Sequence, residues 1–220
     1  MFTLYAFVRT ADDYVDQVPQ DKTGFNQYYK ETMKQLDSHV PSKNPIINSF
    51  IDLAKRKKFR RAWIVAFLNA MRADLTKKNY KSYAELKKYM YGSAEVIGLM
   101  MAQIMNLPEK SYKYAQAQGR AMQLINFIRD LDEDRQLGRN YLAYSTPISE
   151  LRRYARIQNL ASLGYQYIPK RYLIPIKTAS DMYGWTAAKI MKDPSILYRK
   201  KIKPKPIRVV AQLVYNAFKV

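Results

Sequence analysis

Cysteine is absent from the 220 residues, and histidine occurs once, at His39. Disulfides, thiolate metal sites and histidine-based zinc sites or catalytic triads are therefore excluded. We interpret His39, which stands in a polar turn, as an ordinary surface residue. A metal ion bound by this chain must be held by oxygen atoms. Mg²⁺ is the first candidate, with Mn²⁺ or Ca²⁺ as alternatives, because these hard cations prefer carboxylate ligands.

Long uncharged apolar runs are also missing. The longest candidate, 94–107, contains Glu95 and Gln103 and is too short to span a bilayer, so it predicts a buried helix. No signal peptide is visible, because an amphipathic segment follows Met1 at once. We expect a cytoplasmic protein, soluble or attached peripherally to a membrane.

Strand signals are scarce as well: there are no alternating apolar runs and no Asn-Gly or Asp-Gly turns. Apolar residues instead recur at helical spacing along nearly the whole chain. This pattern predicts an all-α fold, with one domain over residues 1–220. The helices are expected at 2–16, 25–37, 45–57, 59–77, 82–106, 109–136, 148–156, 170–192 and 206–218.

Acidic residues are few relative to basic ones, with 18 Asp and Glu against 38 Lys and Arg and a formal charge of +20. Such a charge indicates a polyanionic partner, either nucleic acid, an anionic membrane or a phosphate-bearing substrate. A merely solvated surface, or a thermophilic source, is the alternative. For a membrane, the C-terminal apolar stripe beside Lys203, Lys205 and Arg208 is the expected contact.

The acidic residues that are present include two pairs at helical spacing. Asp12 and Asp16 lie four positions apart in one predicted helix, as do Asp130 and Asp134 in another, so each pair shares a helix face. Like charges so placed disfavour a lone helix and call for a counter-charge. Mg²⁺ bridging a diphosphate would provide it, with the nearby arginines on the phosphate oxygens. Exposed acidic faces that form salt bridges with lysines are the alternative.

These pairs lie within longer motifs that resemble those of the squalene and phytoene synthase family. Two further motifs lie between them, in the family's order. The four read Tyr5-Ala6-Phe7-x-Arg9-x-x-Asp12-Asp13-x-x-Asp16, Met71-x-x-Asp74-Leu75, Tyr89-x-Tyr91-Gly92-Ser93-Ala94-x-x-x-Gly98, and Gln123-x-x-Asn126-x-x-Arg129-Asp130-x-x-Glu133-Asp134 followed by Gly138-Arg139-Asn140-Tyr141.

The resemblance implies an isoprenoid synthase fold, a helical bundle around a central cavity. It also implies head-to-head condensation of two prenyl diphosphates through a cyclopropylcarbinyl diphosphate. We favour geranylgeranyl diphosphate and phytoene. Squalene or dehydrosqualene formation from farnesyl diphosphate is the alternative, and the use of NADPH is left open. A catalytically impaired member acting as a binding or assembly protein is a further alternative, and no nucleic-acid partner is expected.

Residue roles follow from the same motifs. The implied metal ligands are Asp12, Asp16, Asn126, Asp130 and Asp134. The implied catalytic residues are Asp12, Asp16, Asp130, Asp134, Arg9, Arg129, Tyr89 and Tyr183. The implied substrate-binding residues are Tyr5, Arg9, Gln123, Asn126, Arg129, Tyr89, Arg139 and Tyr141.

Other positions are expected to have lesser or double roles. Asp74 is either a site residue or a helix-end or ion-pair residue, and Glu133 is expected to form a salt bridge. The aromatic residues expected to shield a carbocation are Tyr5, Phe7, Tyr89, Phe127 and Tyr183. The small residues Gly92, Ser93, Ala94 and Gly98 are expected to permit close helix packing, to leave room for a prenyl chain, or both.

Compared with the family pattern, the chain is expected to lack an initial helix before Tyr5 and part of a later helix between Arg156 and Gln166. The resemblance implies that the first element contacts the diphosphate and that the second covers one side of the cavity. If they are absent, quenching of the cation by water becomes a concern for this chain.

Overall fold

The computed structural model describes residues 1–38 and 40–219, so the prediction for His39 lies outside the described residues. Within them the chain is helical without strands, and an isolated bridge joins Asn79 to Asn140. The all-α prediction is confirmed. The helices are α1 Phe2–Asp16, α2 Lys22–Ser38, α3 Pro45–Arg56, α4 Arg61–Asp74, α5 Tyr83–Met90, α6 Val96–Ile104, α7 Tyr112–Arg129, α8 Leu131–Gln136, α9 Pro147–Ser162, α10 Lys170–Lys192 and α11 Pro206–Lys219.

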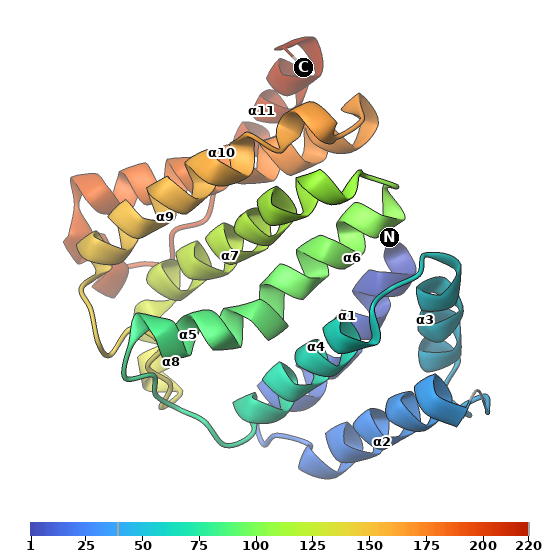
Figure 1. Ribbon diagram of the computed structural model, residues 1–220. Coiled ribbons are helices and arrows are strands. Elements are labelled where there is room, and N and C mark those ends of the chain that lie inside the picture. The colour runs from blue at the N-terminus through green and yellow to red at the C-terminus, as the bar shows by residue number, and fades with distance from the viewer. Residues whose placement is uncertain (39, 220) are drawn as a thin grey trace.

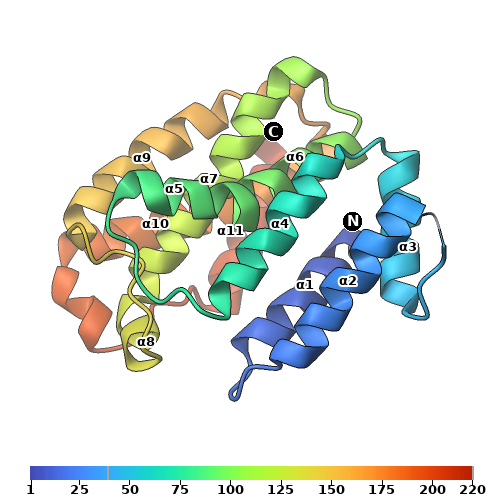
Figure 2. The same cartoon turned by 60° about the horizontal axis from the view of Figure 1, so that its bottom comes forward.

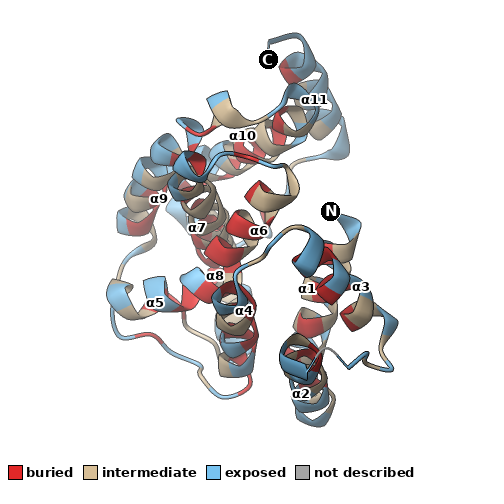
Figure 3. Ribbon diagram, turned by 45° about the vertical axis from the view of Figure 1, so that its right-hand side comes forward, coloured by how far each residue is buried: buried red, intermediate tan, exposed pale blue. Residues whose placement is uncertain are grey.

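The helices are arranged in layers that follow the chain order (Figure 1). The N-terminal helices α1 to α4 form one side, α6 and α7 lie at the centre, and α9, α10 and α11 follow on the other side. The view in Figure 2 shows α1 and α2 side by side, with α4 next to them. One cluster of buried apolar side chains contains residues from α1 through α10 and ends at Ile202. Figure 3 shows that the buried residues concentrate on the inner helices.

Several helix starts are explained by capping. The Asn44 side chain accepts hydrogen bonds from the backbone of Ile46 and Ile47 at the start of α3, and Thr146 accepts one from Ser149 at the start of α9. In both helices a proline occupies the first turn, where its missing N–H is not needed. At the start of α2, Asp21 accepts a hydrogen bond from Gly24, and the helix begins three residues before its predicted start.

The structure corrects three predicted helices. The segment predicted as 82–106 contains a π-helical turn at Tyr91–Glu95, a single wider turn that is too short to change the helical spacing of the apolar residues on either side of it. The helix predicted as 109–136 breaks at Asp130 (φ −96°, ψ 14°), where four of the five residues 130–134 are acidic and repel one another. The helix predicted as 148–156 continues to Ser162, because no breaker precedes Gly164 and Ala161 is buried.

Candidate active site

A cavity of about 360 Å³ opens between α1 and the junction of α7 with α8. We call it the acidic cavity, because five aspartates from three helices and a helix junction line it. Its lining residues are Val8, Asp12, Val15, Asp16, Met71, Asp74, Tyr89, Ser93, Ile97, Gln123, Asn126, Phe127, Asp130, Asp134, Arg139 and Tyr141.

The first aspartate pair reaches the acidic cavity because of the periodicity of α1. Leu4, Phe7, Ala11 and Val15 recur every three or four positions and bury one face of the helix in the core. Val8, Asp12 and Asp16 form the adjacent stripe, four positions apart, and this stripe faces the cavity.

The second pair remains one helical turn apart although α7 ends at Arg129. The backbone N–H of Asp134 donates to the carbonyl oxygen of Asp130 at 2.8 Å, which preserves helical spacing across the break. Gln123 and Asn126 continue the same stripe towards the N-terminus of α7 and also line the cavity. The cavity therefore lies between two stripes that each bear a carboxylate pair.

Burial changes the acidity of three of these groups. Desolvation, reinforced by the Asp16 carboxylate, raises the pKa of Asp12 to about 7. Desolvation, reinforced by Asp130, raises the pKa of Asp134 to about 7 as well. The charges of Asp16 and Asp12 also act on Asp74, whose pKa burial raises to about 7. Accumulated negative charge in a partly dry cleft favours the binding of cations.

Arg139 is a basic residue in the lining of the acidic cavity. Its Nη1 lies 2.9 Å from Asp16 Oδ1, and its Nη2 donates to the carbonyl oxygen of Val15 at 3.3 Å. Its side chain is 13% exposed, so little of the guanidinium faces bulk water. Arg139 thus ties the end of α1 to the segment after α8, and it gives the cavity lining a group that can donate to anionic oxygens.

An aromatic wall closes one side of the acidic cavity. The Phe127 and Tyr141 rings stack with centroids 4.2 Å apart, and Tyr89 contacts both. Tyr80 packs behind Tyr89 and Tyr141. Such faces stabilise a nearby positive charge. Tyr89 and Tyr141 belong to the quoted motifs, Phe127 was expected as an aromatic shield for a cation, and all three line the cavity.

Two residues without a firm predicted role, Asp74 and Ser93, also belong to the site. Asp74 is 6% exposed, and the Tyr89 hydroxyl donates to its Oδ2 at 2.8 Å. Ser93 lies in the π-helical turn and also lines the cavity. Lys201 is a further neighbour that the motifs did not indicate: it pairs with Glu133, as expected for Glu133, and its Nζ lies 4.0 Å from Asp130 Oδ1.

Other predicted residues lie outside the cavity lining. Tyr5 is 66% exposed, and Arg9 pairs with Asp13 on the outer side of α1 at 2.7 Å. Arg129 forms two hydrogen bonds with Asp130, and Tyr183 lies beside Arg129. Arg129 and Tyr183 therefore reach the cavity only through Asp130. Their assigned roles stay predictions.

Phe7, considered as a shield for the cation, is fully buried in the core and stacks on Phe50.

The donor set of the cavity fits Mg²⁺ bound together with a diphosphate. Asp74 Oδ1, Ser93 Oγ and Asn126 Oδ1 are buried and have no hydrogen-bond partner among the described residues, so the cavity has oxygen donors to spare. No three acidic or histidine side chains in the described residues are close enough to bind one metal ion alone. Two separate carboxylate pairs suit Mg²⁺, because this ion usually retains water and phosphate oxygens as ligands and needs only one or two protein carboxylates.

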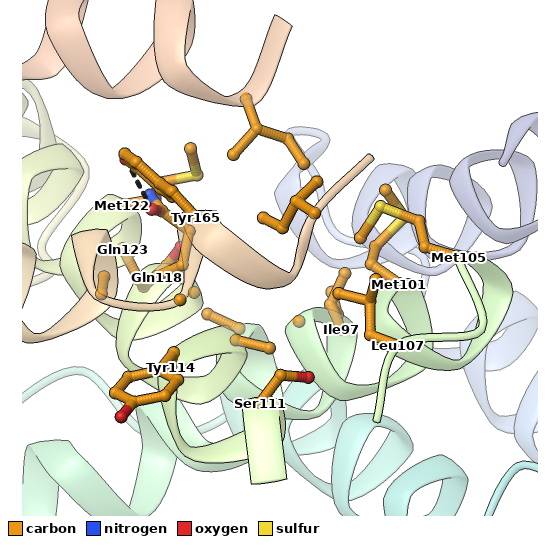
Figure 4. A pocket seen from close by; sticks show the side chains of 18 of the residues that line it. Ile97, Met101, Met105, Leu107, Ser111, Tyr114, Gln118, Met122, Gln123 and Tyr165 are labelled. Carbon is orange, nitrogen blue, oxygen red and sulfur yellow. Dashed lines mark hydrogen bonds between the residues drawn. The ribbon is translucent and has the colours of Figure 1, made fainter. Parts of the chain in front are cut away.

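A second, apolar cavity of about 280 Å³ adjoins the first. Ser93, Ile97 and Gln123 line both cavities. Figure 4 shows Ile97, Met101, Met105 and Leu107 on one side of this apolar cavity and Met122, Gln123, Gln118 and Tyr165 on the other. The Tyr165 hydroxyl donates to Gln118 Oε1 at 3.2 Å, which leaves the remaining lining mainly apolar.

The small residues of the third motif permit close helix packing, as expected, and they also line a cavity; that a prenyl chain occupies this cavity stays a prediction. A Cβ on Gly92 would lie 2.4 Å from the carbonyl oxygen of Ala66, so only glycine permits this close approach to α4. Ser93, Ala94 and Gly98 line the apolar cavity. Replacing Gly98 would also place a Cβ 2.3 Å from the carbonyl oxygen of Ala115 in α7. Close packing and cavity space thus come from the same short segment.

Comparison with known proteins agrees with this geometry. Residues 1–154 match the family described as squalene/phytoene synthase, and the chain belongs to that family. It is 25% identical over 229 residues to a 15-cis-phytoene synthase of Paracoccus sp., covering 90% of this chain and 75% of that protein. It is 28% identical over 148 residues to the 4,4'-diapophytoene synthase of Staphylococcus haemolyticus, covering 65% and 52%.

Two solved structures share the fold. A dehydrosqualene synthase in complex with ligand superposes with a TM-score of 0.81 at 20% identity, covering 99% of this chain and 85% of that one. The squalene synthase HpnC from Alicyclobacillus acidocaldarius gives a TM-score of 0.76 at 20% identity, covering 87% and 81%. The predicted isoprenoid synthase fold is therefore confirmed.

The chain spans about half the length of several curated relatives that it matches, such as 52% of the Staphylococcus protein. In the part of the chain that the structure describes, no helix combines the length and apolarity needed to cross a bilayer.

Proposed function

We propose that this protein condenses two prenyl diphosphates head to head. The observation that supports the proposal most strongly is the junction of the two cavities at Ser93, Ile97 and Gln123. A charged, carboxylate-rich compartment suits a metal-bound diphosphate, and an adjoining apolar compartment suits the hydrocarbon tail of the same molecule. Relatives named phytoene and diapophytoene synthase support the same reaction class.

Mg²⁺ bound at the aspartate pairs would neutralise the diphosphate and so make it a leaving group. The chain's own groups assist the same event. The Arg139 guanidinium would contact the oxygens on which negative charge develops, and the Gln123 and Asn126 amides would orient the diphosphate without adding charge. Because Arg139 is already held by Asp16 and Val15, little reorganisation is needed when the carbon–oxygen bond breaks.

The allylic cation formed in this way must be kept from water. The stacked Phe127 and Tyr141 rings and the Tyr89 ring would offer π-faces to the charge, and the apolar cavity would exclude solvent from the tail. Attack by the second prenyl molecule forms the new carbon–carbon bond. Loss of a proton closes the cyclopropylcarbinyl diphosphate, which loses its own diphosphate and rearranges to an allylic cation. For phytoene, this cation loses a second proton to form the central double bond.

We propose geranylgeranyl diphosphate as the substrate and phytoene as the product. The test is incubation of the purified chain with Mg²⁺ and either geranylgeranyl or farnesyl diphosphate, with and without NADPH, followed by mass analysis of the hydrocarbon. Phytoene formed without NADPH is the expected result. A thirty-carbon product from farnesyl diphosphate would instead establish a dehydrosqualene synthase, or a squalene synthase if the product requires NADPH. Absence of any hydrocarbon would favour a binding or assembly role.

A further inference from the structure

Helix α11 packs against α10 through its polar side chains. Asn216 is fully buried, and its Nδ2 donates to Thr178 Oγ1 at 3.1 Å and to Asp181 Oδ2 at 2.8 Å. Gln212, one turn earlier, donates to the same Asp181 oxygen at 2.8 Å. Lys177 completes the network, with hydrogen bonds to Asp181 and to Asn216 Oδ1. These satisfied polar contacts fix which face of α11 points towards the protein.

The opposite face of α11 is apolar and exposed. Ile207, Val210, Val214 and Phe218 follow one another at helical spacing and are 74%, 56%, 48% and 88% exposed. Figure 3 shows α11 as mainly exposed at the edge of the molecule. An amphipathic helix on a water-soluble surface normally has the reverse orientation, with its apolar stripe inward. A contiguous stripe turned outward marks a surface that contacts something apolar.

Positive charge surrounds this stripe. From Pro194 to the end of the chain the sequence has no acidic residue and seven basic ones, namely Arg199, Lys200, Lys201, Lys203, Lys205, Arg208 and Lys219. Three of the seven, Lys203, Lys205 and Arg208, line a groove of about 740 Å³ whose floor includes Trp185. The Arg208 guanidinium lies 5.1 Å from the Trp185 ring centre. None of these three cations pairs with a carboxylate of the described residues.

We propose that the outward stripe of α11 and the groove formed by Trp185, Lys203, Lys205 and Arg208 dock on an anionic phospholipid bilayer. The apolar stripe enters the acyl boundary, and the three cations and the indole ring lie at the level of the phosphate headgroups. A second copy of the chain is the poorer partner, because a two-fold contact would bring the same positive patch against itself. Nucleic acid would match the cations but would leave the stripe uncovered.

Helix α11 packs on α10, which contributes Ile176 to the lining of the apolar cavity. Resting on the proposed function, docking through α11 holds the site at the bilayer in which prenyl diphosphates and their hydrocarbon products dissolve. Vesicle binding itself requires no catalysis, so the docking proposal and the proposed reaction are tested separately.

The first part of the experiment tests the role of charge. It measures how much protein sediments with anionic vesicles of phosphatidylglycerol and phosphatidylcholine, and how much sediments with neutral vesicles of phosphatidylcholine alone. The full chain is expected to bind the anionic vesicles more tightly. The triple variant Lys203→Gln/Lys205→Gln/Arg208→Gln is expected to lose roughly 100-fold in affinity. The matched control Lys30→Gln/Lys34→Gln/Lys55→Gln removes the same charge from exposed positions on α2 and α3, at the other end of the molecule (Figure 1). It is expected to lose a few-fold at most.

The apolar arm uses Val210→Ser/Val214→Ser, with Val18→Ser/Val40→Ser as a control at two other exposed valines. Only the first variant is expected to lose vesicle binding, and its melting temperature confirms that it folds. Equal losses in variants and controls, or no binding to anionic vesicles, would overturn the proposal. So would a wild-type dimer that Val210→Ser/Val214→Ser dissociates. Diphosphate release in vesicle-free solution is expected to stay unchanged in both α11 variants.

Discussion

At the end of α4, Asp74 is an acid in an unfavourable environment. It is 6% exposed, one carboxylate oxygen accepts from Tyr89, and the other has no partner among the described residues. Burial raises its pKa from 3.8 to about 7, although the Tyr89 hydroxyl and Arg139 oppose the shift. Groups held in this way lower the free energy of unfolding, and they occur chiefly at functional sites.

A substitution at Asp74 tests whether this buried carboxyl group lowers the free energy of unfolding. The folded state holds the Asp74 proton up to about pH 7, whereas the unfolded chain releases it near pH 4. The contribution of Asp74 to stability is therefore largest below about pH 4 and falls as the pH rises through 7. Asp74→Asn, which keeps an acceptor for Tyr89, is expected to stabilise the metal-free protein by about 1–3 kcal/mol at pH 8 and much less at pH 5.

Thermal unfolding of Asp74→Asn and wild type at the two pH values measures this difference. Other titrating groups are shared by both proteins and cancel. Asp52→Asn is the control, because Asp52 lies in an exposed pair with Arg56 that contributes little to stability. An advantage of Asp74→Asn that is the same at pH 5 and pH 8 would show that the Asp74 charge is not the cause.

The sequence predicted which aspartates lie at the site, but it did not predict the side to which each charged side chain turns. Spacing and motifs placed Asp12, Asp16, Asp130 and Asp134 at one cavity, because residues four apart share a helix face whatever the surroundings. It could not show that Arg9 turns outward to Asp13, since this depends on the rotation of α1 against its neighbours. The enclosed position of Asp74 likewise depends on tertiary packing.

At the scale of elements, α7 and the helical segment before it approach each other through glycine. A Cβ on Gly119 would lie 2.4 Å from the carbonyl oxygen of Ala94, and one on Gly98 would lie 2.3 Å from that of Ala115. Gly98, Gly119, Ala94 and Ala115 all line the apolar cavity. The width of this cavity therefore depends on two reciprocal backbone contacts.

Gly119→Ala is expected to destabilise the protein by about 1–3 kcal/mol, because a backbone carbonyl cannot turn away from the new methyl group. Gly184→Ala in α10 is the matched control, since nothing lies within 4 Å of its Cβ position. There the change is expected to be neutral or stabilising by up to about 1 kcal/mol. Chemical denaturation measures both. A destabilisation of equal size in the two variants would contradict the proposed close contact.

Apolar periodicity predicted where the helices lie, but it did not predict where a helix is interrupted. The π-helical turn at Tyr91–Glu95 and the break at Asp130 both lie beside the site and leave the apolar pattern nearly intact. A pattern of buried and exposed positions reports on packing, so it cannot register a local backbone change that packing tolerates. The continuation of α9 to Ser162 was missed because the segment was interpreted through family resemblance rather than through its own helical signal.

At the scale of the whole molecule, the acidic cavity joins segments far apart in the chain. It is lined by α1 at one end of the sequence and by α4, α5, α7 and the α8 region further along. A ligand that binds all of them stabilises the folded state over the unfolded one. Mg²⁺ and diphosphate together are expected to raise the melting temperature by roughly 5–10 °C at a hundredfold excess over Kd, and either alone by much less.

Two variants in α8 distinguish stabilisation by a ligand bound in the cavity from stabilisation by ions bound elsewhere on the charged surface. Asp134→Asn is expected to abolish the joint stabilisation, whereas Asp132→Asn, whose side chain does not line the cavity, is expected to retain it. Differential scanning fluorimetry measures both. Equal responses from the two variants would place the ligand elsewhere on this basic protein.

Mg²⁺-dependent release of diphosphate from labelled geranylgeranyl diphosphate tests most directly whether the two aspartate pairs activate a prenyl diphosphate. Asp12→Asn and Asp130→Asn are expected to lower the rate by about 100-fold or more. Asp13→Asn and Asp132→Asn, neighbours outside the cavity lining, are expected to stay within a few-fold of wild type. Wild-type release no faster than that of Asp12→Asn/Asp130→Asn would contradict the account.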